Sequence, residues 1–479
     1  MHGPVESVAS LLIGGAWRDG ADSMPVTNPF TGSTVAQVAC ANADDVRQAV
    51  ASAVGGAARM RGLTTERRAA ILHRAADALA ARAREFAESI TVESGKPITA
   101  STRETARAVN TLRLSAEEAS RLNGETIAFD SFDGGAMREG YYRYEPVGVV
   151  VAITPFNDPL NLACHKLGPA IAAGNSVILK PADQAPLTAL MLVQLLLDAG
   201  LPADAIAVLT GRGADFGPAL VSARDVAMVS FTGGPKVGQE IARTAGVKRI
   251  SMELGGNGAV IVAADADLEK AATACASGAF WASGQNCIGV QRIFVHAAVY
   301  DSFRELMIAR CRALVAGDPT SPATDVGPLI SNCDAERMAA WTAEAVAAGA
   351  RVCCGGTRDG ALFQPTILEN APDHVHAVSE EAFGPIVTLI RYETLDAAVA
   401  AANRADHTIH AAIFTRDIGQ ARHAAHHLRA GGVMINDSTD YRLDAMPFGG
   451  AGQGNMGREG VRFAMREMAQ TKVVCFNYG

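Results

Sequence analysis

Short apolar segments alternate with helical segments along most of the chain, and this alternation constrains the fold more than any other sequence feature. The first series of apolar segments comprises Gly148 to Thr154, Ser176 to Leu179, Ala205 to Leu209 and Val226 to Phe231. Strands joined through helices run parallel, and strands without a polar face lie in sheets covered on both sides. The alternation begins again after Gly256. The sequence therefore predicts two α/β units, each built on a parallel sheet.

The segments outside these two series predict helices before the first unit and an exposed strand at the end of the chain. Thr64 to Ala87 and Ile98 to Leu122 carry apolar residues at helical spacing, and Arg107 lies on the polar side of the second helix. The final segment, AQTKVVCFNYG, has the pattern of an exposed strand. Such an edge needs a pairing partner, and a second subunit could supply it.

Composition and charge exclude several classes of protein. The 479 residues are 49% hydrophobic and 19% charged, which predicts two or three domains. A net charge of −8 gives no basic excess for nucleic acid, and no apolar run approaches the roughly 18 residues of a membrane span. The N-terminus lacks signal-peptide features, and the nine cysteines form no CxxC pair. We therefore expect a cytoplasmic protein without a disulfide framework, and the lack of metal-ligand spacings predicts no metal site.

Three polar side chains lie where predicted elements end. Cys287 lies in a turn with glycine and asparagine, where a thiol nucleophile has access and nearby backbone donors. Glu253 ends a strand before two glycines, at the carboxyl edge where open α/β sheets bind ligands. Asn157 lies in a proline-flanked turn, where its amide could donate to an oxyanion. Taken singly, Cys287 could equally well be a buried cysteine, Glu253 a surface carboxylate and Asn157 an ordinary turn asparagine.

A dinucleotide could bind at the same edge. The strand through Phe231 leads into Gly233, Gly234 and the start of a helix, and a helix N-terminus of this kind can receive a pyrophosphate. Lys180 and Asp183 follow another strand end, where they could contact a ribose or a phosphate. The alternatives are an ordinary glycine turn and exposed loop charges.

Together, these segments resemble the aldehyde dehydrogenase superfamily over nearly the whole chain. The segments that carry the resemblance are TPFNDPLN, VILKPADQAPLTAL, SFTGGPKVGQ, MELGGNGAV, GQNCIGVQR, EEAFGPI and NDSTDYRLDAMPFGG, in the order and approximate spacing of the family. The resemblance implies a Rossmann-like nucleotide-binding domain (1–123 and 147–255), an α/β catalytic domain (256–455) and a small β oligomerisation element (124–146 and 465–479). It further implies a homodimer or a homotetramer.

Carried over position by position, the resemblance implies an NAD(P)-dependent oxidation of an aldehyde to a carboxylate. Cys287 would be the nucleophile, forming a thiohemiacetal and then a thioester, and Asn157 would hold the oxyanion. Glu253 would activate the water that hydrolyses the thioester, and because CoA-acylating relatives usually lack this glutamate, water is the expected acceptor. The implied cofactor contacts are Thr154, Pro155, Phe156, Lys180, Asp183, Gly213, Phe231, Gly233, Gly234, Val237, Glu381 and Phe383.

The resemblance also bears on the cofactor and the aldehyde. Asp183 favours NAD, since its carboxylate would bind the ribose hydroxyls and repel a 2′-phosphate, but it is shorter than glutamate and leaves NADP open. Arg107 and Arg442 fall at the implied aldehyde entrance, where a guanidinium group binds carboxylate, phosphonate or sulfonate. The C-terminal motifs resemble the branch of lactaldehyde and phosphonoacetaldehyde dehydrogenases. Asn286 and Asp158 depart from the phosphonate enzymes, where we expect basic residues at both positions.

The expected substrate is therefore a small anionic aldehyde such as phosphonoacetaldehyde, with succinate semialdehyde and lactaldehyde as alternatives. Two other classes of protein stay open at this point. One is a dinucleotide-binding protein of this fold without catalysis, against which Cys287, Glu253 and Asn157 argue. The other is a CoA-dependent semialdehyde dehydrogenase. Assays of several aldehydes with NAD, NADP and CoA separate these possibilities.

Overall fold

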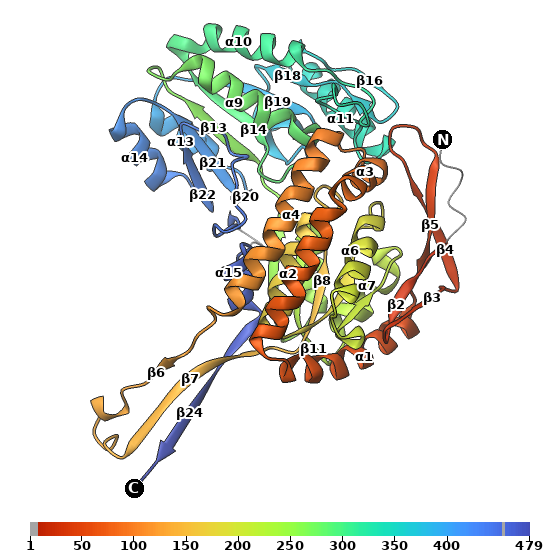
Figure 1. Ribbon diagram of the computed structural model, residues 1–479. Helices are drawn as coiled ribbons and strands as arrows, with labels where there is room; N and C mark the ends of the chain where they lie inside the picture. Colours follow the sequence, from red (N-terminus) through yellow and green to blue (C-terminus); the bar gives the residue numbers. More distant parts are fainter. Residues whose placement is uncertain (1–7, 453–455) are drawn as a thin grey trace.

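The computed structural model of the chain describes residues 8–452 and 456–479, and it confirms the predicted α/β fold class (Figure 1). Residues 1–7, part of the stretch that lacks signal-peptide features, and residues 453–455, at the end of the predicted catalytic domain, lie outside the described residues. Within the described part of the chain, none of the helices combines the length and the apolar character that a membrane span needs.

The first sheet has seven strands and contains the first predicted series. In spatial order the strands are β12 (Arg249–Leu254), β11 (Val226–Gly233), β8 (Val149–Ile153), β9 (Ser176–Lys180), β10 (Ile206–Val208), β2 (Leu11–Ile13) and β3 (Ala16–Arg18). The five strands from β12 to β10 are parallel, and β2 and β3 add an antiparallel edge. The carboxyl ends of the five parallel strands therefore meet along one edge.

Helices bury both faces of this sheet, as the apolar strands require. One face packs against α2 (Thr65–Ala81), α4 (Ile98–Ala119), α5 (Asn161–Ala173) and α6 (Leu187–Asp198), and the other against α1 (Ala43–Gly62), α7 (Gly213–Ser222) and α8 (Pro235–Thr244). The prediction of one helix from Thr64 to Ala87 was wrong, because a second helix, α3 (Ala83–Ser94), starts within it. The break lies at Arg82, whose φ of −109° and ψ of 18° leave the helical region.

The second sheet also has seven strands. In spatial order they are β15 (Arg351–Cys354), β18 (Thr366–Glu369), β19 (Ile386–Tyr392), β14 (Val290–His296), β13 (Gly258–Val262), β21 (His410–Phe414) and β22 (Gly432–Ile435). All neighbours are parallel except β15 and β18. This arrangement confirms the second predicted series of strands.

A third sheet projects from the body of the molecule as an arm (Figure 1). It contains β24 (Ala469–Asn477), β7 (Arg138–Pro146) and β6 (Glu125–Thr126), in that order. The predicted C-terminal strand, β24, therefore pairs along one edge with β7 of the same chain. Its other edge is the outer edge of this sheet. Each of the three sheets described above consists of residues from one predicted domain, while the domain boundaries themselves stay a prediction.

Candidate active site

A cavity of about 620 Å³ lies at the carboxyl edge of the first sheet, where the loop before β14 of the second sheet reaches it. It brings together nearly all the residues that the sequence singles out, from the carboxyl ends of the five parallel strands of the first sheet and from three segments of the second unit. Those that line it are Thr154, Pro155, Phe156, Asn157, Lys180, Asp183, Gly213, Phe231, Gly233, Gly234, Val237, Glu253, Cys287, Glu381, Phe383 and Arg442. Arg107 is the one predicted site residue outside this lining.

The loop that carries Cys287 contacts the loop that carries Asn157. The Asn157 side-chain nitrogen donates a hydrogen bond of 3.0 Å to the backbone oxygen of Gln285. Just before it, Ala282 and Ser283 have φ values of 51° and 60°, a left-handed backbone that residues other than glycine seldom adopt. The Ser283 hydroxyl holds this turn through a buried 2.9 Å hydrogen bond to a backbone carbonyl. The turn thus presents Cys287 to the cavity beside the predicted oxyanion donor.

Cys287 lies in a largely apolar environment that also contains charged groups. Burial raises the pKa of the Cys287 thiol, and the positive charge of Arg442 is the main opposing influence. The negative charges of Glu381 and Glu459 raise the pKa of the thiol further. The thiol is therefore the resting form at neutral pH, and Arg442 is the nearby group that favours the reactive thiolate.

Glu253 lies at the carboxyl end of β12, paired in register with Thr232 of β11. Both of its carboxyl oxygens are buried, and neither has a hydrogen-bond partner among the described residues. Burial raises the pKa of Glu253 well above its ordinary value, and the negative charge of Glu459 adds to this effect. A carboxyl group with a raised pKa and free lone pairs is suited to take a proton from water.

The predicted phosphate and ribose contacts come together at the ends of β9 and β11. Lys180 forms an ion pair with Asp183, and the backbone nitrogen of Gly213 lies 3.4 Å from the second oxygen of Asp183. Helix α8 starts directly after Gly234, with Pro235 as its first residue and no side chain capping its N-terminus. Its first amide groups are therefore available to an anion, and the donor set fits a pyrophosphate and a ribose.

Glu381 closes the cavity on the side of the second unit. Its Oε1 accepts a 2.9 Å hydrogen bond from the backbone nitrogen of Gly256. A Cβ atom at Gly255 would lie 2.0 Å from its Oε2, so the close approach depends on glycine. Burial raises the pKa of Glu381 to about 7. Phe383 packs edge-to-face against Phe156, with 5.8 Å between the ring centroids, and joins the two units across the cavity.

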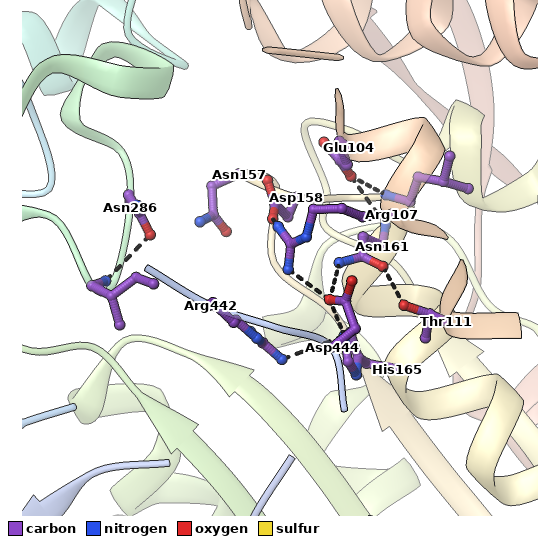
Figure 2. Close-up of polar contacts among 12 residues, drawn as sticks. Glu104, Arg107, Thr111, Asn157, Asp158, Asn161, His165, Asn286, Arg442 and Asp444 are labelled. Carbon is purple, nitrogen blue, oxygen red and sulfur yellow. Dashed lines mark hydrogen bonds and ion pairs between the residues drawn. The ribbon is translucent and has the colours of Figure 1, made fainter. Parts of the chain in front are cut away.

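Arg107 is held by two carboxylates. Its Nη1 lies 3.3 Å from Asp158 Oδ2, and its Nη2 lies 2.8 Å from Asp444 Oδ1 (Figure 2). Asp158 also pairs with the buried Lys96, so its charge is balanced by two cations. Asn286, the other departure from the phosphonate enzymes, accepts a local hydrogen bond of 3.2 Å from the backbone nitrogen of Ile288.

Arg442 lines the cavity and also has fixed partners. Its Nη2 lies 3.1 Å from Glu459 Oε2, and its guanidinium group stacks 3.6 Å above the ring centroid of Phe448. Glu459 in turn contacts the buried Lys166, with 3.2 Å between Oε1 and Nζ. Of the two predicted anion contacts, Arg442 is the one placed to meet a bound molecule.

Sequence reasoning missed several ionisable residues around the cavity. They are Lys96, Glu104, His165, Lys166, Asp444 and Glu459. One signal was present, because His165 and Lys166 are adjacent ionisable residues in the apolar helix α5, all of which is buried. Ionisable groups are seldom buried without partners. Glu459 and Asp444 lie in loops that carry no such signal.

Known proteins match both the sequence and the fold of this chain. The family model of the aldehyde dehydrogenase family matches residues 17–474. Aspartate-semialdehyde dehydrogenase 1 of Pseudomonas canavaninivorans is 50% identical, over 94% of this chain and 96% of that protein. Among solved structures, aldehyde dehydrogenase 21 of Physcomitrella patens, in complex with the reaction product succinate, is 35% identical with a TM-score of 0.96, over 100% of this chain and 99% of that one.

A second solved structure is similarly close. The NADP-dependent glyceraldehyde-3-phosphate dehydrogenase of Bacillus halodurans, complexed with NADP, has a TM-score of 0.97 at 33% identity, over 99% of this chain and all of that one. Fold and sequence match over nearly the full length of the chain. The chain belongs to the aldehyde dehydrogenase family, as its motifs predict.

Proposed function

We propose that this chain oxidises a short aldehyde to the corresponding carboxylate through a thioester on Cys287. The observation that supports the proposal most directly is the convergence of Cys287, Asn157 and Glu253 on one cavity, together with the predicted cofactor contacts. Membership of the aldehyde dehydrogenase family supports an enzyme rather than a non-catalytic dinucleotide-binding protein.

In the first half of the reaction, the Cys287 thiolate attacks the aldehyde carbon and forms a thiohemiacetal. The Asn157 amide and the Cys287 backbone N–H stabilise the oxyanion, and the contact of Asn157 with Gln285 leaves one of its two amide hydrogens for this role. NAD(P), when bound, supplies the hydride acceptor for the tetrahedral carbon. Loss of hydride from that carbon leaves a thioester on Cys287.

In the second half, Glu253 takes a proton from a water molecule, which then attacks the thioester. The raised pKa of Glu253 makes it a stronger base once it is ionised, and no competing hydrogen bond holds its oxygens within the described part of the chain. Hydrolysis releases the carboxylic acid and regenerates the thiol. The presence of this base favours water over CoA as the acceptor.

For the cofactor, we propose NAD ahead of NADP. Lys180, Asp183, Gly213 and the N-terminus of α8 would hold the adenosine ribose and the pyrophosphate, and Glu381 would hold the second ribose. The Asp183 carboxylate would repel a 2′-phosphate, but its pairing with Lys180 reduces that repulsion and leaves NADP use open. The relative from Bacillus halodurans binds NADP with the same fold.

For the substrate, we propose a short aldehyde with a negatively charged group at its other end. Arg442 would bind that group, while Arg107 would hold the loop of Asn157 in place. Phosphonoacetaldehyde and succinate semialdehyde are candidates of this kind, and the neutral lactaldehyde stays as the alternative. Two relatives support a carboxylate, since one is named for aspartate semialdehyde and the other forms succinate, whereas others are named for the sulfonates 3-sulfolactaldehyde and sulfoacetaldehyde.

For the assembly, we propose a homodimer or a homotetramer joined through the arm. The outer edge of β24 has unpaired backbone groups, and Val473 and Phe476 on this strand are exposed apolar residues. A second copy of the chain would cover both the unpaired edge of β24 and the exposed apolar side chains.

The proposal is tested by Cys287→Ala, with Cys333→Ala, which removes an exposed cysteine, as the matched control. We expect Cys287→Ala to abolish NADH formation from every aldehyde while NAD still binds in a fluorescence titration. Cys333→Ala should retain wild-type turnover. Full activity of Cys287→Ala would overturn the mechanism.

A further inference from the structure

Lys96 is a buried lysine that has no part in the proposed mechanism. It lies between α3 and α4, and its side chain is only 4% exposed. Its Nζ lies 2.6 Å from Glu104 Oε2 and also forms an ion pair with Asp158. Burial alone would lower the pKa of Lys96, but the negative charges of Asp158 and Glu104 raise it, so the ammonium group stays charged. Removal of this group would take the common partner from two carboxylates.

The two carboxylates hold the loop of the predicted oxyanion donor at both of its ends. Asp158 directly follows that donor in the sequence. Glu104, on α4, uses its other oxygen to accept hydrogen bonds from the backbone nitrogens of Leu160, at 2.9 Å, and Asn161, at 3.1 Å, where α5 begins (Figure 2). One ammonium group therefore joins the contacts that fix both ends of this loop.

The same ammonium group faces the turn that leads to Cys287. Its nitrogen lies 5.5 Å from the centroid of the Trp281 ring, within the range of a cation–π interaction. Trp281 begins the turn in which Ala282 and Ser283 have a left-handed backbone. Lys96 thus contacts residues on both loops that meet at the predicted oxyanion site.

Backbone contacts fix this turn relative to the segment of Lys96. The Ser283 hydroxyl donates a 2.9 Å hydrogen bond to the backbone oxygen of Gly327 and accepts a 3.0 Å hydrogen bond from its backbone nitrogen. A Cβ atom at Gly327 would lie 2.4 Å from the backbone oxygen of Gly95, so the residue before Lys96 packs directly on Gly327. The turn therefore keeps its place without the ammonium group, whereas the loop of Asn157 depends on it.

On the basis of the proposed function, we infer that Lys96 is a positioning residue for the oxyanion site: its ammonium group holds the loop of Asn157 against the turn of Cys287. The contact that this position maintains is the 3.0 Å hydrogen bond from the Asn157 amide to the backbone oxygen of Gln285. Lys96 itself touches no reacting atom. A displaced oxyanion donor weakens the transition state more than the bound substrate, so its loss lowers kcat and leaves KM nearly unchanged.

The first test compares Lys96→Met with Lys270→Met, which removes an exposed ammonium group on α9 (Leu268–Phe280). The assay uses succinate semialdehyde, phosphonoacetaldehyde and lactaldehyde, and the variants are measured with the aldehyde that the wild-type protein oxidises fastest. Lys96→Met should lower kcat about tenfold to hundredfold, while KM and the dissociation constant of NAD change by less than about threefold. Lys270→Met should keep the wild-type kcat.

A double-mutant cycle separates positioning from a general loss of structure. Asn157→Ala should lower kcat about 100-fold to 1,000-fold, and Lys96→Met should cost less than about threefold more in that background, because the donor that it positions is gone. Alkylation of Cys287 by iodoacetamide forms no oxyanion, so its rate should change by less than about threefold in Lys96→Met. A merely structural role would lower kcat by the same factor in both backgrounds.

Equal factors in the two backgrounds, or an unchanged kcat in Lys96→Met, would overturn the inference while the proposed function stands. If Asn157→Ala keeps the wild-type kcat, or if the wild-type protein oxidises no aldehyde with NAD or NADP, both fall. If Lys96→Met does not fold, Asp158→Ala, which removes the carboxylate that ties the loop to Lys96, replaces it in the cycle. The same two outcomes then decide the matter.

Discussion

Arg107 and Asp158 form an ion pair, with 3.3 Å between Nη1 and Oδ2, that joins α4 to the loop carrying Asn157 (Figure 2). The resemblance to the family implies that Arg107 is an anion contact, and it leaves Asp158 as a departure from the phosphonate enzymes. In the structure, the two charges compensate each other, and Asp444 completes the site around Arg107. The pair therefore belongs to the framework of the active site.

For this reason, Arg107→Ala should lower kcat for anionic and neutral aldehydes by similar factors. The substitution leaves Asp158 and Asp444 with fewer partners, and we expect the free energy of unfolding to fall by about 1–3 kcal/mol. Arg121→Ala, at an exposed arginine just after α4, should leave the free energy of unfolding nearly unchanged. Thermal unfolding and steady-state kinetics measure both effects. A selective rise in KM for anionic aldehydes would instead show that Arg107 binds the substrate directly.

Glu253→Gln should separate the two halves of the reaction. The Cys287 thioester should still form, since that half does not need the base, and its hydrolysis should slow by about 100-fold to 10,000-fold. Rapid mixing should then show a burst of NADH near one equivalent per active site, followed by slow turnover. A variant that turns over at the wild-type rate without a burst would remove Glu253 from the role of base.

NAD should bind more tightly as the pH rises through about 7. Burial raises the pKa of Glu381 to about 7, so the carboxylate that we propose as the acceptor for the ribose hydroxyls predominates above that pH. If the ionised form alone binds, the dissociation constant at pH 6 exceeds that at pH 8 by up to about tenfold. Glu381→Gln should flatten this dependence, and Glu380→Gln, at the exposed neighbouring residue, should preserve it. Calorimetry at several pH values measures the effect, and a flat wild-type profile would contradict it.

Asp183→Asn should shift the cofactor preference toward NADP. The substitution removes a charge of the same sign as a 2′-phosphate, and an interaction of about 1–2 kcal/mol corresponds to a change of about fivefold to thirtyfold in the ratio of kcat/KM for NAD and NADP. Asp198→Asn, at an exposed carboxylate at the end of α6, should leave that ratio unchanged. If the wild-type protein already prefers NADP, Asp183 does not select the cofactor.

Local sequence was sufficient to place Cys287, Glu253 and the glycine turn at Gly233 next to the ends of elements, because the apolar pattern of those elements is visible in the sequence, while the roles predicted for these residues came from the resemblance to the family. The partners of Arg107 could not be predicted in this way. Asp444 reaches Arg107 from a loop far along the chain. Tertiary packing therefore decides whether the guanidinium group of Arg107 binds a substrate or a carboxylate of the chain itself. The helix break at Arg82 was missed for a similar reason, since the apolar spacing continues on both sides of it.

The reactivity of Cys287 should depend on Arg442. Burial raises the pKa of the thiol, so its alkylation by iodoacetamide should accelerate with pH beyond the range of an ordinary cysteine. Arg442 is the main influence that lowers this pKa, and Arg442→Gln should therefore slow alkylation at a given pH by about threefold to tenfold. The exposed Cys333 serves as an internal control, because mass spectrometry quantifies both cysteines in one sample. Equal rates at Cys287 in the wild-type and variant proteins would show that Glu459 already neutralises the arginine, leaving the thiolate to be stabilised by the backbone donors of its own turn.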